Sequence, residues 1–480
     1  MKRFTIFVLL SVTAAALRAQ SVTQAEAMQR ASRYYNEHVR PAGLRSTAEA
    51  EPAAVTPWMA GDTTCMYAVQ MDGGGWVLVS ADDRTTVSVL AYSENGTFDT
   101  DDMPDGMRWL LGDYADQIMR VKRDSTIVTS AATPGLRSNQ PANSGTGSER
   151  YTPGEWLLNL KGEGEILWNQ NWYDGDEINF ASEGDSCSRA YNYFCPSYGL
   201  RSSKADCYCQ KAPAGCGPVA MGQIMRYWKW PLMTAVPTSV GGDPQEIRNY
   251  EWSLMPVSVT HESSIEDAQR VSLLLRDIGY AANATYRVDG TSSSKENIVK
   301  AFERFSYHAV CTKVSGDWSS TVRNEIDQGR PVIYGGYKQS GGGHWFVVDG
   351  YNKGTPNMFH INWGWAGSCN CECVLSELAP DGDKDEDGNQ VVYSENHEII
   401  YEIYPICSVA EKTKLTGTST GDVSFSAKSV EVMIQNPSSS LTIYADEVTL
   451  LPGTEVSLGA SMNIITPSYQ YCQTKGPGKK

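Results

Sequence analysis

Three side chains in this sequence have types that together could break an amide bond: Cys216, His344 and Asn362. A cysteine attacks a carbonyl carbon as its thiolate, and a neighbouring imidazole takes the thiol proton and later returns it to the leaving group. A third polar group commonly holds that imidazole in the required orientation. The sequence around each of the three predicts an element that could present it in this way.

Cys216 stands at the predicted start of a helix. Gly215 and Gly217 loosen the backbone on either side, and Pro218 suits a first helical turn, where its missing N–H is not needed. An apolar stripe with helical spacing follows at Met221, Ile224, Met225 and Trp228. The N–H groups and dipole at this end of a helix favour the thiolate. Taken alone, Cys216 could equally be a packed thiol or one half of a disulfide.

The histidine and the asparagine lie on two predicted strands, within residues 340–351 and 358–367, which a turn would join into a hairpin. An antiparallel register centred on Lys353 would place His344 directly opposite Asn362, although other registers are open. In that register the imidazole and the amide lie side by side, so the amide could orient the base.

His360 is the one rival to His344 as the catalytic base, because it has the same strand parity as Asn362 and lies close to it. The glycine-rich approach to His344 favours His344. Trp363 and Trp365 follow directly and would cover the pair.

The spacing of these residues points to a known class. His344 follows the cysteine by 128 residues (344 − 216) and Asn362 by 146 (362 − 216), close to the separation of about 130–150 in papain-like enzymes. Three segments resemble the streptopain family of secreted bacterial cysteine peptidases, which belongs to the papain-like clan. They are Gly-Cys-Gly-Pro-Val-Ala at 215–220, Gly-His-Trp-Phe-Val-Val-Asp-Gly at 343–350 and Asn-Trp-Gly-Trp at 362–365.

The resemblance implies roles for further residues. Trp168-Asn169-Gln170 is similar to the family segment whose glutamine lines the oxyanion hole, which makes Gln170 a donor to the developing oxyanion. Ser294 lies where the family contacts the substrate backbone. Gly343, which adjoins the base, and Trp363 are further candidates for substrate contact. For Ser294 a helix cap is the simpler explanation.

The fold class expected is α+β, a papain-like peptidase with additions at both ends. Residues 1–19 resemble a signal peptide, with a basic start and a short apolar core. Residues 20–130 are expected to form an α+β pro-domain, and residues 131–150 a polar linker suited to activation cleavage. The peptidase domain would span 151–405, and 406–480 would be a small all-β extension built of short strands.

The predicted pro-domain has its own elements. Helices are expected at 25–39 and 107–119, and strands at 66–70, 76–80 and 87–92. Its strand sequences resemble the inhibitory pro-domain of the streptopain family, which implies a zymogen whose own pro-domain acts as an intramolecular inhibitor. An ordinary accessory domain is the alternative.

The composition of the chain limits the classes of partner that it could bind. The chain has 480 residues, a formal charge of −16 and a pI near 4.9. An acidic chain argues against a nucleic-acid partner, which would require a basic surface. After the signal peptide no stretch has the roughly eighteen apolar residues of a membrane span. We therefore expect a protein that is secreted to the extracellular space or held at the cell surface, with protein and peptide substrates.

The chain has twelve cysteines, many for its length, and an oxidising compartment favours disulfides. Setting aside Cys216 and the pro-domain cysteine leaves ten, enough for up to five bridges. Cys369, Cys371 and Cys373 could suggest zinc, but their spacing lacks the usual two-residue gap, so no metal is expected there.

No cofactor is expected either, with one exception left open. Asp383, Asp385 and Asp387 match the start of a calcium-binding loop, although the glutamate expected at its twelfth position is absent.

The sequence therefore predicts a cysteine endopeptidase made as a zymogen, acting through a thioester acyl-enzyme. Two alternatives remain: a transglutaminase-like or amide-hydrolysing enzyme with the same Cys-His chemistry, and a catalytically inactive surface-binding protein that keeps the scaffold.

Overall fold

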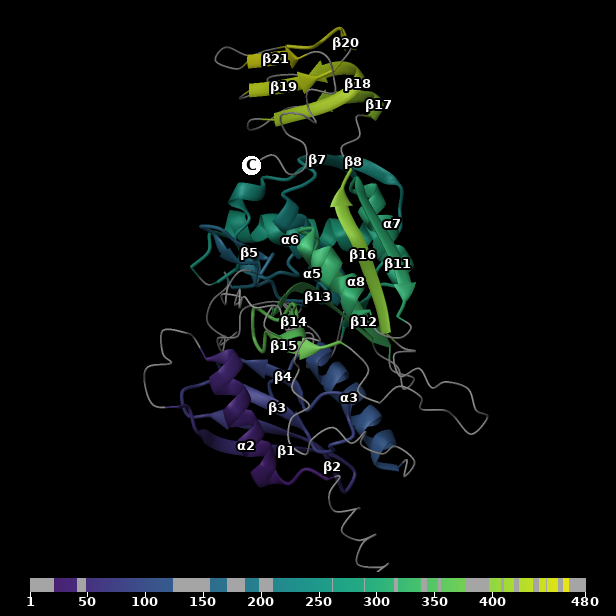
Figure 1. Ribbon diagram of the computed structural model, residues 1–480. Coiled ribbons are helices and arrows are strands. Elements are labelled where there is room, and N and C mark those ends of the chain that lie inside the picture. Colours follow the sequence, from purple (N-terminus) through teal and green to yellow (C-terminus); the bar gives the residue numbers. More distant parts are fainter. Residues whose placement is uncertain are drawn as a thin grey trace, which may run out of the picture. The chain divides into compact units, whose positions relative to one another are not determined.

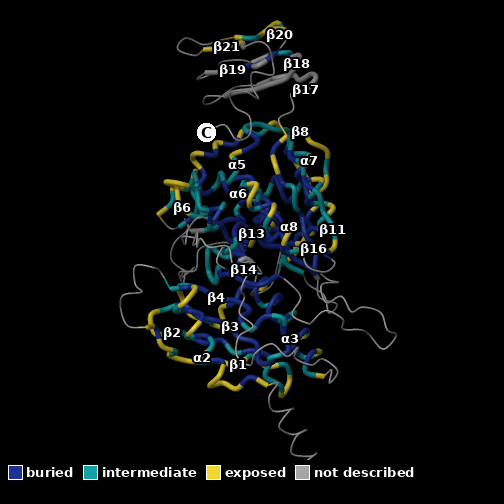
Figure 2. The backbone as a smooth tube through the Cα atoms, in the orientation of Figure 1, coloured by how far each residue is buried: buried dark blue, intermediate teal, exposed yellow. Residues whose placement is uncertain are grey.

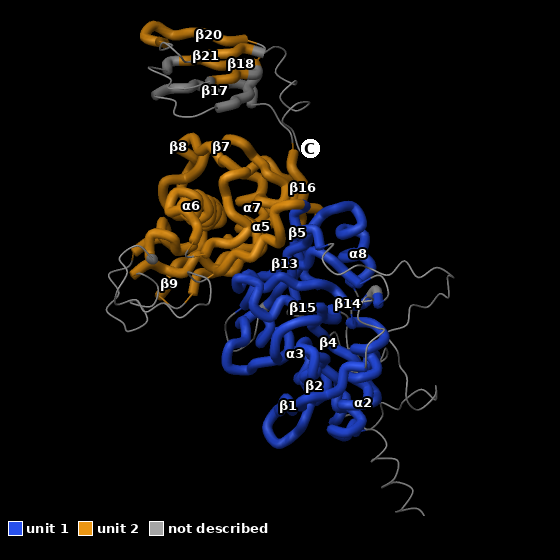
Figure 3. Tube along the Cα trace, turned by 90° about the vertical axis from the view of Figure 1, so that its left-hand side faces the viewer, with its two compact units in different colours: residues 1–161, 311–401 blue, residues 162–310, 402–480 orange. Residues whose placement is uncertain are grey.

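The computed structural model describes most of the chain in two compact units (Figure 3). Unit 1 comprises residues 1–161 and 311–401, and unit 2 comprises residues 162–310 and 402–480. The described residues are 21–40, 49–123, 156–170, 186–197, 210–260, 262–288, 290–314, 318–337, 343–352, 355–375, 397–406, 410–417, 423–434, 440–445, 447–455 and 461–465.

The N-terminal part of unit 1 is an α+β layer (Figure 1). Its first helix begins where Thr23 and Glu26 form a reciprocal capping box, which satisfies two N–H groups at the helix start. The predicted strand at 76–80 has the observed bounds, and the other predicted helices and strands of this part are confirmed with shifted ends. The elements are α2 (Gln24–Tyr34, continued by a π turn at Tyr35–Val39), β1 (Pro52–Ala60), β2 (Thr63–Met71), β3 (Trp76–Ser80), β4 (Val89–Ser93) and α3 (Asp105–Arg123).

A ten-stranded sheet joins this layer to the second part of unit 1. Its order is β1-β2-β3-β4-β15-β14-β13-β12-β16-β11, and the connection is the antiparallel pair β4–β15. Strands β3 and β4 of the N-terminal layer are buried along their full length (Figure 2). The remaining elements are β11 (Tyr307–Lys313), α8 (Ser319–Asp327), β12 (Val332–Tyr337), β13 (Gly343–Asn352), β14 (Thr355–Asn362), β15 (Cys371–Val374) and β16 (His397–Pro405).

Unit 2 is built around a buried helix, α5 (Cys216–Trp228), packed against α6 (Ile265–Ala281). Gly222 permits the close approach, since a Cβ there would lie 2.9 Å from Leu275 Cδ2. The other described elements are α7 (Lys295–Arg304), the hairpins β7 (Met233–Pro237) with β8 (Pro244–Asn249) and β9 (Thr285–Arg287) with β10 (Gly290–Ser292), and short turns of 3₁₀-helix at Ser186–Arg189 and Trp252–Leu254. The chain also has two short strands, β5 (Asn159–Leu160) and β6 (Gly164–Glu165).

The described C-terminal elements are all strands, as the sequence predicts, and their pairing is parallel. The C-terminal part of β18 pairs with β17 and β20, and its N-terminal part pairs with β19. Strands that follow one another in the sequence therefore lie side by side in the same direction. The offset between paired residues is 17 for Ala410 and Ala427 (427 − 410) and 18 for Val423 and Leu441 (441 − 423). The strands are β17 (Ala410–Gly417), β18 (Val423–Ile434), β19 (Ser440–Tyr444), β20 (Glu447–Leu450) and β21 (Ser461–Ile465).

Among the described helices, none combines the length and apolar character needed to cross a bilayer.

Candidate active site

Cys216 is the first residue of α5, as its sequence context predicts. Gly215 precedes it with φ +91°, a backbone conformation that glycine adopts without strain. A Cβ on Gly215 would lie 2.7 Å from the carbonyl oxygen of Thr291, so the close approach of β10 also requires glycine. The Cys216 side chain is held at the N-terminal end of the helix, where N–H groups and the helix dipole favour an anion.

Interactions along α5 fix its position in unit 2. Gln223 donates from Nε2 to the Ile166 carbonyl (3.1 Å), and Arg226 donates from Nε to the Met255 carbonyl (3.0 Å). Arg226 also pairs with Glu163 at 2.5 Å. These buried polar groups anchor the helix, so the position of Cys216 is set by a rigid element rather than by a mobile loop.

Gln170 lies beside the cysteine loop. The Gly215 N–H donates to the Gln170 carbonyl oxygen (2.8 Å), and Gln170 is buried. Two residues earlier, Trp168 is fully buried and donates from Nε1 to the Pro256 carbonyl (3.0 Å). Unit 2 therefore brings the predicted nucleophile and the predicted oxyanion donor into neighbouring backbone positions.

His344 lies near the start of β13 in unit 1, with Gly343 before it. The opposite residue on β12 is Gly336, so no side chain stands beside the imidazole on that strand. The N-terminus of α3 covers the histidine instead. Asp105 Oδ2 is 4.0 Å from His344 Nε2, and a Cβ on Gly106 would lie 3.7 Å from His344 Cβ.

The hairpin register differs from the predicted one. Asn362 pairs with Val347 rather than with His344, because β-bulges interrupt the pairing of β13 with β14 between Val348 and Gly350 and between Tyr351 and Asn352. As a result, the partner of Asn362 lies three residues further along β13 than in the predicted register (347 − 344). The argument from strand pairing that set Asn362 beside His344 is therefore wrong, and the orienting role of Asn362 stays a prediction.

The structure does place Trp363 near the histidine. A Cβ on Gly106 would lie 3.1 Å from Trp363 Cε3, in the same place where it approaches His344. Trp363 is buried, and its Nε1 donates to the Cys369 carbonyl (2.8 Å). Asn362 accepts from the Gly364 N–H through its side-chain oxygen (3.0 Å).

His360 has the environment of a structural residue. It is buried, its Nδ1 lies 2.6 Å from Asp349 Oδ1, and its ring is stacked on Trp156 with 4.2 Å between the centroids. Asp349 also accepts from the Leu158 N–H (3.1 Å), so the pair holds the segment that starts at Trp156 against β13. This packing favours His344 over His360 as the base.

Ser294 is the N-cap of α7, where its hydroxyl accepts from the Asn297 N–H (3.3 Å). The structure thus confirms the simpler explanation for this serine. A contact between Ser294 and substrate stays a prediction.

The structure has fewer disulfides than the upper limit of five that the number of cysteines allows. Cys187 is in a disulfide, but Cys195, Cys369, Cys371 and Cys373 carry thiols. The sulfur atoms of Cys371 and Cys373 are 3.4 Å apart, well beyond the bond length of about 2.05 Å. Five bridges are therefore excluded. Burial raises the pKa of the Cys195 thiol to about 12.

Several predictions fall outside the described residues. These are the signal peptide at 1–19, the linker at 131–150, and the calcium ligands Asp383, Asp385 and Asp387. Each stays a prediction.

Sequence reasoning missed the residues through which the N-terminal layer contacts the histidine-bearing part. Besides Asp105 these are Trp109, Asp113 and Tyr114 of α3, and the pair Tyr92–Glu372 in the β4–β15 ladder. The available signal was the amphipathic helix predicted at 107–119, but the surface it covers cannot be deduced from its own sequence.

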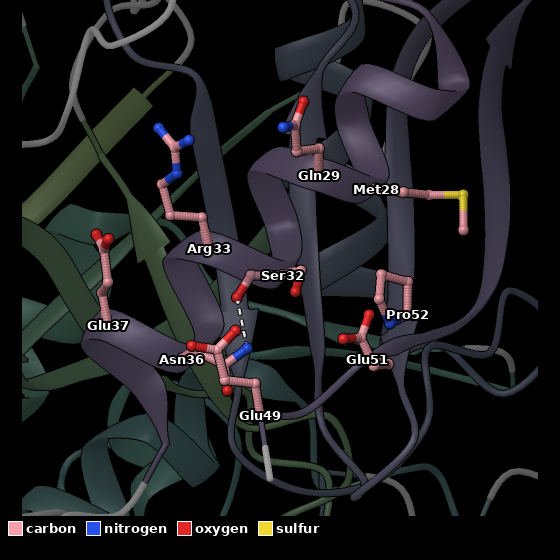
Figure 4. Close-up of a pocket in the computed structure, with 9 residues that line it drawn as sticks. All are labelled: Met28, Gln29, Ser32, Arg33, Asn36, Glu37, Glu49, Glu51 and Pro52. Atoms are coloured by element: carbon pink, nitrogen blue, oxygen red, sulfur yellow. Dashed lines mark hydrogen bonds between the residues drawn. The ribbon is translucent and has the colours of Figure 1, made fainter. Parts of the chain in front are cut away.

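A surface hollow of about 620 Å³ lies on the N-terminal layer, between α2 and the start of β1 (Figure 4). Arg33 and Glu37 line one side, and Glu49 and Glu51 line the other. None of the residues predicted to do chemistry lines this hollow, so we do not assign the active site to it.

Comparison with known proteins gives the affiliation of both parts of the chain. Residues 186–371 match the peptidase C10 family, and residues 19–118 match the Spi protease inhibitor family. The part of the chain at residues 186–371 is therefore similar to a family of peptidases, and the part before it is similar to a family of protease inhibitors. The match to the second family covers the N-terminal layer of unit 1, including α2, β1–β4 and most of α3.

Named relatives agree with these two matches. The chain is 28% identical over 418 residues to the thiol protease/hemagglutinin PrtT of Porphyromonas gingivalis, covering 82% of this chain and 43% of that protein. It thus spans less than half the length of PrtT. Streptopain from Streptococcus pyogenes is 27% identical over 338 residues, covering 66% of this chain and 75% of streptopain. A solved structure of a prointerpain A fragment from Prevotella intermedia shares the fold, with a TM-score of 0.50, 20% identity, and coverage of 73% of this chain and 99% of that chain.

Proposed function

We propose that this chain is the precursor of a secreted cysteine endopeptidase. The observation that carries the proposal is the position of the Cys216 thiol at the N-terminus of the buried helix α5. The N–H of the preceding residue, Gly215, donates to the Gln170 carbonyl oxygen, so Gln170 lies next to the cysteine. The match of residues 186–371 to the peptidase C10 family supports it.

The residues would act as follows. His344 takes the thiol proton, and the Cys216 thiolate attacks the carbonyl carbon of the scissile bond. The Gln170 side chain and the Cys216 N–H stabilise the resulting oxyanion. His344 then returns the proton to the leaving amine as the C–N bond breaks, which leaves a thioester on Cys216. Water, activated by His344, hydrolyses the thioester and releases the acid. Asn362 is proposed to orient His344.

The N-terminal layer would keep the precursor inactive. Asp105 and Gly106 occupy the space over His344, and the strand pair β4–β15 fastens the layer to the same unit. A substrate backbone cannot approach the imidazole while α3 is there. Cleavage of the linker at 131–150 would then turn a tethered inhibitor into one that can leave.

The test is to follow purified precursor on a gel together with casein hydrolysis. We expect the wild type to shorten to a new N-terminus within 131–150 and to hydrolyse casein, while Cys216→Ala stays at full length. Hydrolysis of small amides without casein cleavage would favour the amide-hydrolysing alternative. Processing of Cys216→Ala at the wild-type rate would contradict self-activation by Cys216.

A further inference from the structure

The place where α3 rests on the peptidase part has the character of a binding pocket. Trp109 of α3 is almost fully buried, and its ring lies 4.8 Å from the His397 ring and 6.3 Å from the Phe346 ring, measured between centroids. Tyr334 closes the other side, since its hydroxyl is 2.9 Å from His397 Nδ1 and its ring is 5.8 Å from Phe346.

The strand register explains why there is room for an indole here. Gly336 on β12 is paired with His344 on one side and with His397 on the other. Paired residues point to the same face, so a glycine leaves a gap between two imidazoles that stand about two strand spacings, roughly 10 Å, apart. The aromatic rings of Phe346 and Tyr334 border this gap in the neighbouring row. We call the space bordered by Gly336, Phe346, Tyr334 and His397 the Trp109 pocket.

The pocket lies close to the catalytic imidazole. Phe346 follows His344 by two residues on the same strand face, which is about 7 Å along the strand. One turn before Trp109, Gly106 packs directly over His344. The helix therefore covers the imidazole and fills the pocket at the same time.

The chemistry of the proposed reaction says which part of a substrate would pass here. His344 must protonate the leaving amine, so the polypeptide on the leaving-group side of the scissile bond has to lie against His344. An extended chain advances about 3.3 Å per residue, so a point 7–10 Å from the imidazole is reached by the second or third residue after the cleaved bond.

We propose, resting on the function proposed above, that the Trp109 pocket becomes a specificity pocket for an aromatic substrate side chain two or three residues after the cleaved bond. The pro-domain fills it with Trp109 in the precursor, and departure of α3 opens it. The flat rings of Phe346 and His397 offer the edge and face contacts that aromatic side chains prefer. Asp113 pairs with His397 Nε2 at 3.2 Å in the precursor, so the pocket also loses a carboxylate when α3 leaves.

The test uses self-processed wild-type enzyme and internally quenched peptides of identical sequence before the cleaved bond. Each of the four positions after the bond carries Trp, Phe, Leu, Ala or Asp in turn. We expect kcat/KM to rise about tenfold or more from Ala to Trp or Phe at the second or third position only, the range typical of a side-chain pocket. An equal response to Ala, Phe and Trp at both positions would overturn the proposal.

A variant assigns the preference to the pocket. Phe346→Leu should lower the ratio of Trp to Ala turnover at the responsive position, whereas the matched change Tyr404→Leu, at an exposed site on β16, should leave the ratio unchanged. Because the readout is a ratio, partial loss of active enzyme does not affect it. An unchanged ratio in Phe346→Leu would also contradict the proposal. Failure of wild-type enzyme to cleave any peptide or casein would instead contradict the proposed function.

Discussion

Release of the pro-domain should depend on pH through Glu372. This residue is buried on β15, between Tyr92 on the pro-domain strand β4 and His360 on β14, each of which is its direct cross-strand partner. Burial, followed by nearby Glu94 and Asp349, raises the pKa of the Glu372 carboxyl from 4.5 to about 8, while His360 acts in the opposite direction.

The direction of the effect follows from linkage. In the assembled precursor Glu372 holds its proton up to about pH 8. Once β4 leaves, the carboxyl meets solvent and ionises near its ordinary value of 4.5. Release therefore loses a proton between these two values. Retention of the pro-domain is strongest below pH 4.5 and weakens as pH rises, by at most about tenfold in the dissociation constant per pH unit, until about pH 8.

The assay uses a full-length Cys216→Ala precursor with a site for an added protease placed within residues 131–150. After the cut, the dissociation constant of the two pieces is measured by sedimentation from pH 5 to pH 8. Glu372→Gln mimics the protonated carboxyl and should bind with a much flatter pH dependence. The control Glu303→Gln, at an exposed position of α7, should follow the parent protein.

The reasoning is refuted if Glu372→Gln keeps the same pH slope as the parent protein, or if the parent binds its pro-domain more tightly as pH rises. Weak binding by Glu372→Gln at every pH would likewise contradict it, because a neutral isostere should preserve the contact.

Three further predictions concern single side chains. His344→Ala should abolish peptide hydrolysis without changing the thermal midpoint by more than a few degrees, whereas His360→Ala should mainly lower the midpoint; the reverse pattern would overturn the assignment of the base. Trp109→Ala should shorten the lag before self-activation at least tenfold, because loss of a buried indole costs about 3–5 kcal/mol of pro-domain binding and folding; an unchanged lag would contradict its role. Gly215→Ala should destabilise unit 2 by about 1–3 kcal/mol through its positive φ and the contact with β10, measured by denaturant unfolding, while Gly73→Ala, at a site with open space, should change stability little.

Local patterns in the sequence were sufficient for the elements that carry the site. The apolar stripe from Met221 to Trp228 is a property of one helix, so it predicts α5 and puts Cys216 at its start. The run Trp76–Ser80 is rich in β-branched and aromatic residues, with Trp76, Val77 and Val79, and it forms β3 with the predicted bounds. In both cases a single element buries its own face, so no distant partner decides the outcome.

Pairing between distant segments could not be predicted in the same way. The contact of Tyr92 with Glu372 joins residues 280 positions apart (372 − 92), and the sequence of neither strand indicates that the other is its partner. The register of β13 with β14 depends on two irregularities in the pairing, and hydrophobic alternation does not reveal the extra residues at either of them. The parallel pairing of β17–β21 could not be predicted either, because short apolar strands have the same sequence pattern in parallel and antiparallel sheets.

The central claim, that Cys216 is the nucleophile of a peptidase held inactive by its own pro-domain, is tested most directly by mass spectrometry of labelled thiols. Self-processed enzyme and Cys216→Ala precursor are treated with one equivalent of an epoxide thiol inhibitor, digested and mapped. We expect one label per chain on Cys216 of the self-processed enzyme, with loss of casein hydrolysis in proportion to labelling, and no label on the Cys216→Ala precursor. Freshly purified wild-type precursor, treated in the same way, should be labelled much more slowly. Proportional loss of activity with the label on another cysteine, or equally rapid labelling of precursor and processed enzyme, would contradict the claim.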